Sequence, residues 1–112
     1  MTTDDLITRY WRSWQDQDWT VMRECLADSV RITDGRSQFT DPDDFVTMAG
    51  RGPEWGEIRM LRTEFGDDGG AILYEGENRS DGLLVRTAEF YRVEEGRITE
   101  IEITWSPAGE LG

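Results

Sequence analysis

The chain has 112 residues, and we expect a single domain over residues 1–112 because two separate hydrophobic cores would each be too small. Its 12 basic and 24 acidic residues give a net charge of −12, which argues against nucleic acid or an anionic membrane as a partner. Apolar residues make up 37% of the chain and are joined by 12 glycines, a composition typical of a folded globular protein rather than a disordered one.

The N-terminal segment predicts an amphipathic helix. Thr3 is the expected N-cap, and Asp4 and Asp5 would stabilise the positive end of the helix dipole. Apolar side chains then recur on one face with the 3.6-residue period of a helix: Leu6, Ile7, Tyr10, Trp11 and Trp14. This face is therefore expected to pack against the rest of the protein.

Two further helices and a short strand are expected before residue 51. Asp18 predicts the cap of a short helix over residues 19–25. Residues 30–33 predict a short strand with alternating apolar side chains. The third helix is expected over residues 42–50, because Asp41 supplies a cap and proline stands at the first helical position.

From Trp55 onward the pattern is that of strands joined by short turns, which predicts an antiparallel meander. The expected strands are residues 58–65, 71–78, 83–93 and 97–105. In the last of them, alternation would put Ile101 and Ile103 on one face and Ile98 with Glu100 on the other. The fold class is therefore α+β, with three N-terminal helices packed on the concave face of a curved, mostly antiparallel sheet.

The residue types that are missing restrict the chemistry. The chain has no His and no Lys, which excludes a Ser-His-Asp triad, a His-containing zinc site, a Schiff-base lysine and a phosphate-loop lysine. The lone Cys25 allows no internal disulfide and no thiolate metal cluster. We therefore expect no metal and no cofactor. No apolar run approaches the roughly 20 residues that span a bilayer, and the acidic start is unlike a signal peptide, so a cytoplasmic location is expected.

Several short motifs resemble the nuclear transport factor 2-like superfamily, which includes ketosteroid isomerases and SnoaL-like polyketide cyclases. The motifs are Arg9-Tyr10, Asp18, Leu26-Ala27-Asp28, Val30-Arg31-Ile32-Thr33-Asp34, Glu89-Phe90-Tyr91-Arg92-Val93 and Gly96-Arg97-Ile98. The resemblance implies a cystatin-like α+β roll in which the sheet forms a cone with a pocket. It also implies a catalytic base at Asp34, an oxyanion-hole tyrosine at Tyr10, and a protonated acid at Glu89, where the family has aspartate.

Each of these three residues also has a purely structural interpretation. Tyr10 lies in the apolar stripe of its helix and would suit a core tyrosine with a backbone hydrogen-bond partner. Asp34 precedes a glycine and would suit the cap of a turn. Glu89 shares an otherwise uncharged strand face, so it needs solvent, an arginine partner such as Arg62, or a raised pKa that leaves it neutral.

The aromatic residues suit a cavity for a flat apolar or aromatic small molecule. The expected lining comprises Trp11, Trp14, Trp55, Tyr91, Ile101, Ile103 and Trp105. The alternative is that these side chains form an ordinary core.

Three functions are compatible with the sequence. The first is an isomerase-like enzyme that moves a proton next to a carbonyl; the second is a small-ligand-binding or accessory protein without catalysis. The third is an epoxide hydrolase with an Asp-Arg-Asp set, in which Arg62 or Arg86 would have to face two pocket carboxylates. A SnoaL-like cyclase is a further alternative that the resemblance allows, whereas dehydratases of this fold depend on histidine, which is absent. A homodimer through the outer sheet face is also expected, with Leu84, Ala88 and Phe90 as contacts.

Overall fold

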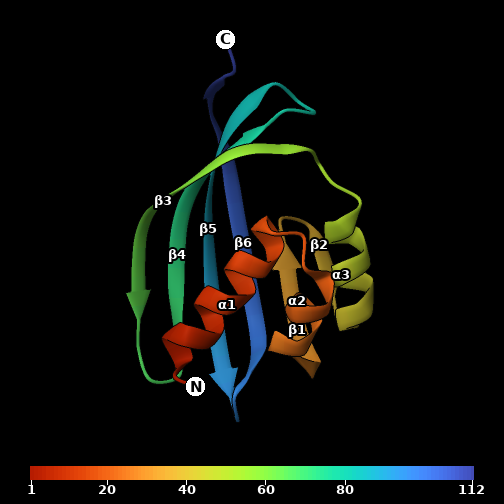
Figure 1. The fold of residues 1–112 in the computed structure, drawn as a ribbon, viewed down its shortest axis with the longest axis vertical. Coiled ribbons are helices and arrows are strands. Elements are labelled where there is room, and N and C mark those ends of the chain that lie inside the picture. The colour runs from red at the N-terminus through yellow and green to blue at the C-terminus, as the bar shows by residue number, and fades with distance from the viewer.

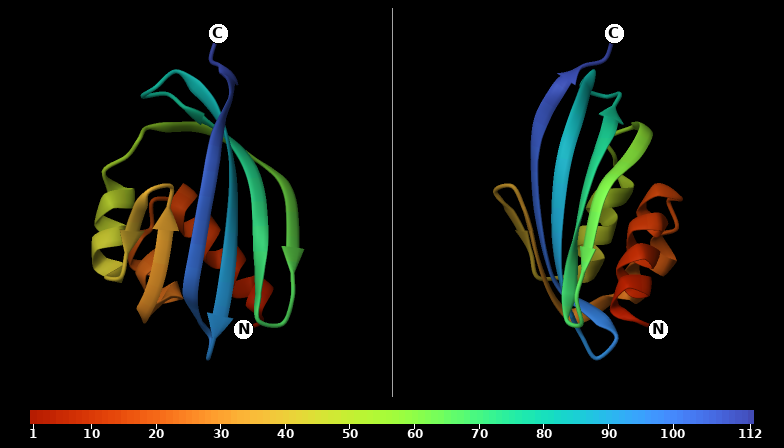
Figure 2. Two further views of the ribbon diagram at one scale, coloured as in Figure 1. Left: turned by 180° about the vertical axis from the view of Figure 1, so that it is seen from behind. Right: turned by 90° about the vertical axis from the view of Figure 1, so that its left-hand side faces the viewer.

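The computed structural model describes all residues 1–112, with three helices on one face of a six-stranded sheet. The helices are α1 (Thr3–Gln15), α2 (Trp19–Cys25) and α3 (Pro42–Gly50). The strands are β1 (Leu26–Asp34), β2 (Ser37–Phe39), β3 (Trp55–Phe65), β4 (Gly69–Asn78), β5 (Leu83–Glu94) and β6 (Arg97–Glu110). Seen from behind, the strands lie in front of the helices (Figures 1 and 2). The α+β class and the helix-covered curved sheet are confirmed.

The sheet is antiparallel except at one junction. Its strand order is β2-β1-β6-β5-β4-β3, so the predicted meander of four strands forms one side of it. Strand β1 pairs with β6 in parallel, and β2 pairs with β1 in antiparallel fashion. The parallel pair joins the helical first third of the chain to the last strand. Most neighbouring strands of the sheet are therefore consecutive in the sequence, and β1 and β6 are the one pair of neighbours that lie far apart in the chain.

The α1 helix begins at a capping box centred one residue earlier than predicted. The Thr2 side chain accepts a hydrogen bond from Asp5 N at 3.2 Å, and Thr2 N donates to Asp5 Oδ2 at 3.4 Å. The cap is therefore Thr2 and not Thr3, because the reciprocal bond requires an acidic side chain three residues after the cap. Asp18 and Asp41 cap α2 and α3 as predicted.

The strands are longer than the sequence indicated, and β2 was not predicted. Strand β1 begins directly after α2, and β6 continues to Glu110. Ile98 is fully buried, as Ile101 is, so its expected place on the face opposite Ile101 was wrong. A register shift between Arg92 and Val93 inserts an extra residue in β6, and this brings Ile98 onto the same face as Ile101.

The buried core lies between α1, α2 and the concave face of the sheet. It is a cluster of 17 side chains, with Ile7, Val30, Ile98 and Ile101 fully shielded from solvent. None of the three helices is long and apolar enough to cross a membrane. The convex face of the sheet carries no helix, as the two views of Figure 2 show.

Candidate active site

The strand register places Asp34 and Glu89 on either side of one residue of β6. Ile103 pairs with Asp34 in β1 and with Glu89 in β5. Paired residues of neighbouring strands project their side chains from the same face, and neighbouring strands lie about 4.8 Å apart. The two acids therefore point from the concave face with backbones roughly 10 Å apart.

A cavity of about 380 Å³ lies over this part of the sheet, and 13 of its 20 lining residues are hydrophobic. It is large enough for a small organic molecule. Of the residues expected at this site, most line the cavity: Tyr10, Trp11, Trp14, Asp34, Trp55, Glu89, Ile103 and Trp105. Ile101 and Tyr91 do not line it, because both are buried in the core behind the wall.

Glu89 is held by two tyrosines and by no arginine. The Tyr74 hydroxyl donates to Glu89 Oε2 at 2.6 Å, and the Tyr91 hydroxyl donates to Oε1. Arg62 instead contacts Glu64 at 2.7 Å, and both side chains are exposed, so of the three environments open to Glu89 the arginine partner is not the one observed. The register explains this result: Arg62 pairs with Leu73 on the convex side of the sheet, whereas Glu89 faces the cavity.

The environment of Glu89 favours its neutral form. Burial raises the pKa of its carboxyl, the two phenol hydrogen bonds oppose that rise, and the charge of Asp34 adds to it. The net pKa is above the ordinary value of a glutamate. A neutral carboxyl carries a hydrogen that it can donate to a ligand.

Tyr10 presents a free hydroxyl to the cavity. Its side chain is 3% exposed and packs edge-to-face on Tyr91, with ring centroids 5.8 Å apart. The hydroxyl takes part in no hydrogen bond within the protein, so the backbone partner of the purely structural interpretation is absent. Among the side-chain polar atoms that are fully enclosed by the protein, only Trp11 Nε1 lacks a partner. The Tyr10 hydroxyl also lacks a partner but is not fully enclosed, and Tyr10 lines the cavity, so the hydroxyl is open to it. Burial, followed by the charge of Glu89, raises the pKa of Tyr10 well above its usual value.

Asp34 ends β1 at the cavity wall. Its side chain is half-buried and makes no hydrogen bond to the adjacent turn; Gly35 N donates to Ile103 O instead. Burial raises the pKa of the Asp34 carboxyl. A carboxylate with a raised pKa and no partner is a stronger base than an ordinary aspartate.

The sequence reasoning did not single out Tyr74, although the signal was present. The expected strands 71–78 and 83–93 were separated by a four-residue turn, so residue 78 should pair with residue 83. Counting back along both strands pairs Tyr74 with Thr87, and this is the observed register. Both residues line the cavity, and the hydroxyl of Tyr74 reaches the Glu89 carboxyl on the same strand as Thr87.

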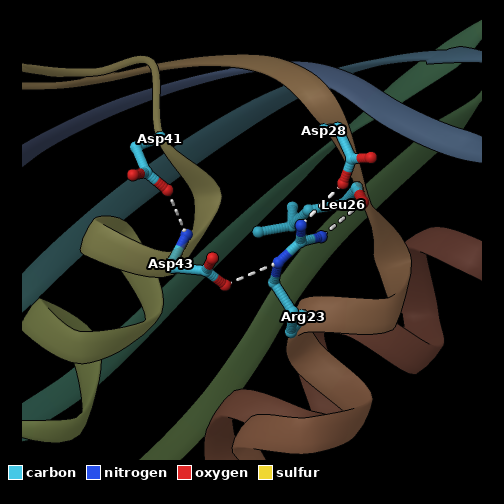
Figure 3. Close-up of polar contacts among 5 residues, drawn as sticks. All are labelled: Arg23, Leu26, Asp28, Asp41 and Asp43. Atoms are coloured by element: carbon cyan, nitrogen blue, oxygen red, sulfur yellow. Dashed lines mark hydrogen bonds and ion pairs between the residues drawn. The ribbon is translucent and has the colours of Figure 1, made fainter.

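The α3 helix supplies one wall of the cavity, and an arginine fixes its position. Arg23 of α2 donates to Asp43 Oδ1 of α3 at 2.8 Å and to Asp28 Oδ1 of β1 at 2.6 Å (Figure 3). It also donates to the carbonyl of Leu26 at 3.2 Å. One guanidinium thus joins three elements, and it holds in place the helix that carries the lining residues Phe45, Met48 and Ala49.

The sequence matches the SnoaL-like domain family over residues 7–101. The chain belongs to the SnoaL-like family. Solved structures named NTF2-like or cystatin-like are similar to it, which confirms the nuclear transport factor 2-like fold that the motifs indicated. A search of curated protein sequences finds no significant match.

Three solved structures that are similar to this SnoaL-like chain carry the names of three different kinds of enzyme. A candidate ketosteroid isomerase from Kribbella flavida has a TM-score of 0.85 and 18% identity, covering 96% of this chain and 80% of that chain. A candidate polyketide cyclase from Sinorhizobium meliloti has a TM-score of 0.78 and 16% identity, with coverages of 89% and 94%. An LEH-like epoxide hydrolase from M. tuberculosis has a TM-score of 0.75 and 17% identity, with coverages of 91% and 80%. At these identities the likeness shows the fold and not the reaction.

Proposed function

We propose that this protein is an enzyme of the ketosteroid isomerase type, which transfers a proton at the carbon next to a carbonyl group. The observation that supports this proposal is the pairing of a half-buried, unpartnered carboxylate, Asp34, with a free buried phenol, Tyr10, across one apolar cavity. A base and a hydrogen-bond donor with well-separated pKa values are what such a reaction requires.

The proposed reaction begins with Asp34. Its carboxylate takes the α-proton, and the electrons of the broken C–H bond move to the carbonyl oxygen, which becomes an enolate oxygen. Tyr10 donates a hydrogen bond to that oxygen, and its raised pKa keeps the phenol protonated. Neutral Glu89 supplies a second donor beside it, with the Tyr74 hydroxyl on Oε2. Return of the proton from Asp34 to another carbon completes the isomerisation.

The charges of the two acids support this division of roles. Glu89 is more deeply buried than Asp34, and the charge of Asp34 raises the pKa of Glu89 further, so the arrangement favours an ionised Asp34 beside a neutral Glu89. An apolar cavity strengthens both the proton transfer and the hydrogen bonds to the enolate, because water does not compete for them.

The proposal is tested by following deuterium exchange at the α-carbon of cyclic ketones and β-diketones by NMR. Asp34→Asn removes the base and should slow exchange by about 10²- to 10⁴-fold. Asp68→Asn, which removes an exposed acid in the β3–β4 turn, is the matched control and should exchange at the wild-type rate. Equal exchange by Asp34→Asn and the wild type would rule the mechanism out.

The second candidate function is ligand binding without catalysis, which the largely hydrophobic lining favours. In that case an aromatic ketone would quench tryptophan fluorescence, because Trp11, Trp14, Trp55 and Trp105 all line the cavity. The wild type would show no exchange, and Tyr10→Phe would bind as tightly as the wild type. The epoxide hydrolase alternative lacks its arginine: neither Arg62 nor Arg86 lines the cavity, and Arg86 contacts Glu75 on the convex face at 3.0 Å.

A further inference from the structure

A second polar site lies at the other end of the same cavity, in the β4–β5 hairpin. Asn78 ends β4, Leu83 begins β5, and Asp81 lies in the turn between them; all three line the cavity. Glu89 lies six residues along β5 from Leu83, which is about 20 Å at 3.3 Å per residue. Figure 1 shows this hairpin at the top of the molecule, beyond the upper ends of the helices. The polar groups are therefore separated along the length of the cavity.

The Asp81 carboxylate is held in a fixed orientation. Asn78 Nδ2 donates to Asp81 Oδ2 at 3.1 Å, and Asp81 N donates to Asn78 Oδ1 at 3.1 Å. Asn78 is 7% exposed and anchors the pair in the wall, whereas the Asp81 side chain is exposed to solvent. Asp81 Oδ1 has no partner, and the arginine nearest in sequence, Arg79, is directed to Glu77. One carboxylate oxygen thus remains able to accept a hydrogen bond from a ligand.

The charges that line the cavity are all of one sign. Its ionisable acids are Asp34, Asp81 and Glu89, and none of the 12 arginines of the chain is among the 20 lining residues. A carboxylate or phosphate inside it would meet like charges with no cation to offset them, whereas an ammonium group would meet an unpaired carboxylate. Tyr10 is only 3% exposed, and its hydroxyl has no partner within the protein. This is a second, independent indication that the cavity binds a ligand with a polar group.

We propose that the cavity selects an elongated ligand that carries an ammonium group, or a neutral hydrogen-bond donor, at its hairpin end, and that Asp81 makes this selection. Anionic ligands such as free acids and phosphate esters are rejected. The proposal rests on the cavity of the proposed function and names the class of substrate for it, but it is measured by binding and needs no turnover.

The test uses 2-naphthols with a straight alkyl chain at position 6, three to eight methylenes long, that ends either in an amine or in a carboxylate. The naphthol hydroxyl is offered to Tyr10, and the chain reaches toward Asp81. Isothermal titration calorimetry at neutral pH gives the Kd of each compound. For at least one chain length the wild type should bind the amine about tenfold more tightly than the carboxylate.

Two matched variants identify the residue responsible. Asp81→Asn keeps the size of the side chain and should reduce the amine-to-carboxylate preference to within about threefold. Asp68→Asn makes the same change of net charge at the opposite end of the sheet and should keep the full preference. An unchanged preference in Asp81→Asn, or no preference in the wild type at any chain length, would overturn the proposal.

The outcomes also separate this proposal from the proposed function. Charge selection at Asp81 without ketone exchange would leave the selection standing and remove the catalysis. Exchange that depends on Asp34, with no selection between the naphthols, would do the reverse. Failure of every naphthol to bind would overturn the selection, and the exchange measurement alone would then decide the proposed function.

Discussion

Glu89 shows how one residue acquires its properties from its neighbours. It is the single acidic side chain on the inner face of β5, between Thr87 and Tyr91, and all three are buried. An ionised carboxylate there would lose its hydration, so its environment must either provide donors or keep it neutral. The structure does both, with two phenols that donate to the carboxyl and a net pKa that is raised.

This raised pKa predicts a pH dependence of stability. A folded-state pKa above the ordinary value of about 4.3 means that the native state binds the proton more tightly than the unfolded state. The stabilisation is complete below that ordinary value and is lost as the pH rises through the raised value, at up to about 1.4 kcal/mol per pH unit. Relative to Glu89→Gln, which cannot ionise, the wild type should lose free energy of unfolding above pH 4.3.

Urea denaturation between pH 4 and pH 8 measures this difference. Glu94→Gln removes an exposed carboxylate on the same strand and serves as the control, which should follow the wild type at every pH. A constant offset between Glu89→Gln and the wild type across the range would show that Glu89 keeps an ordinary pKa.

At this scale the sequence indicated which residues to consider but not their partners. Tyr10, Asp34 and Glu89 were found from side-chain periodicity and family motifs, and all three face one cavity. The turn length indicates the register between β4 and β5, but the partners of Glu89 also depend on side-chain rotamers, which no single segment specifies. For that reason Arg62 was considered and Tyr74 was missed.

At the scale of secondary-structure elements, capping residues were the most reliable signals. Asp18 and Asp41 located the starts of two helices because each side chain satisfies a backbone N–H that the helix leaves unpaired. The three-residue strand β2 has too few residues for alternation to be visible, and it exists only because β1 offers it an edge. Ile98 was misplaced because a bulge changes the side-chain period in a way that the sequence does not signal.

The Arg23 bridge makes the position of α3 depend on one side chain. The Arg23 side chain is about a third exposed, and its guanidinium donates hydrogen bonds to two carboxylates and one carbonyl (Figure 3). Arg23→Ala should therefore lower the free energy of unfolding by about 1–2 kcal/mol, since charge-assisted bonds at three acceptors are lost together.

Arg9→Ala is the matched control for this prediction. Arg9 makes a single ion pair, with Glu24 at 2.9 Å, and is more exposed than Arg23. Its loss should change the free energy of unfolding by less than about 0.5 kcal/mol. Thermal or urea denaturation measures both variants, and an equal effect of the two substitutions would show that the bridge contributes no more than an ordinary surface pair.

For the whole molecule, the convex face of the sheet is the surface best suited to a second copy of the chain. It carries Leu84 and Ala88, both half-buried, and Phe90, which is 51% exposed. Around them lie charges of both signs, including Arg59 and Arg86 on either side of Glu75. A face with both signs can be complementary to itself despite the net charge of −12. We propose a homodimer through this face.

Analytical ultracentrifugation tests the dimer. The wild type should sediment with twice the 12.9 kDa mass of the chain, and Phe90→Glu should shift it to the monomer mass, because the charge would be buried without a partner. Met60→Glu changes an apolar residue that is 40% exposed but pairs with Tyr74, away from the convex face, and should remain dimeric. A monomeric wild type would dispose of the proposal.

The position of Ile103 between Asp34 and Glu89 has a consequence for protein quality. A shift of β6 by one residue against β1 or β5 would turn its inward side chains outward, and the two acids would no longer flank the same isoleucine. Chains that fold in the wrong register would retain their secondary structure but lose the cavity. The number of ligand molecules bound per chain in a titration would then count the correctly assembled fraction of a preparation, which circular dichroism would overestimate.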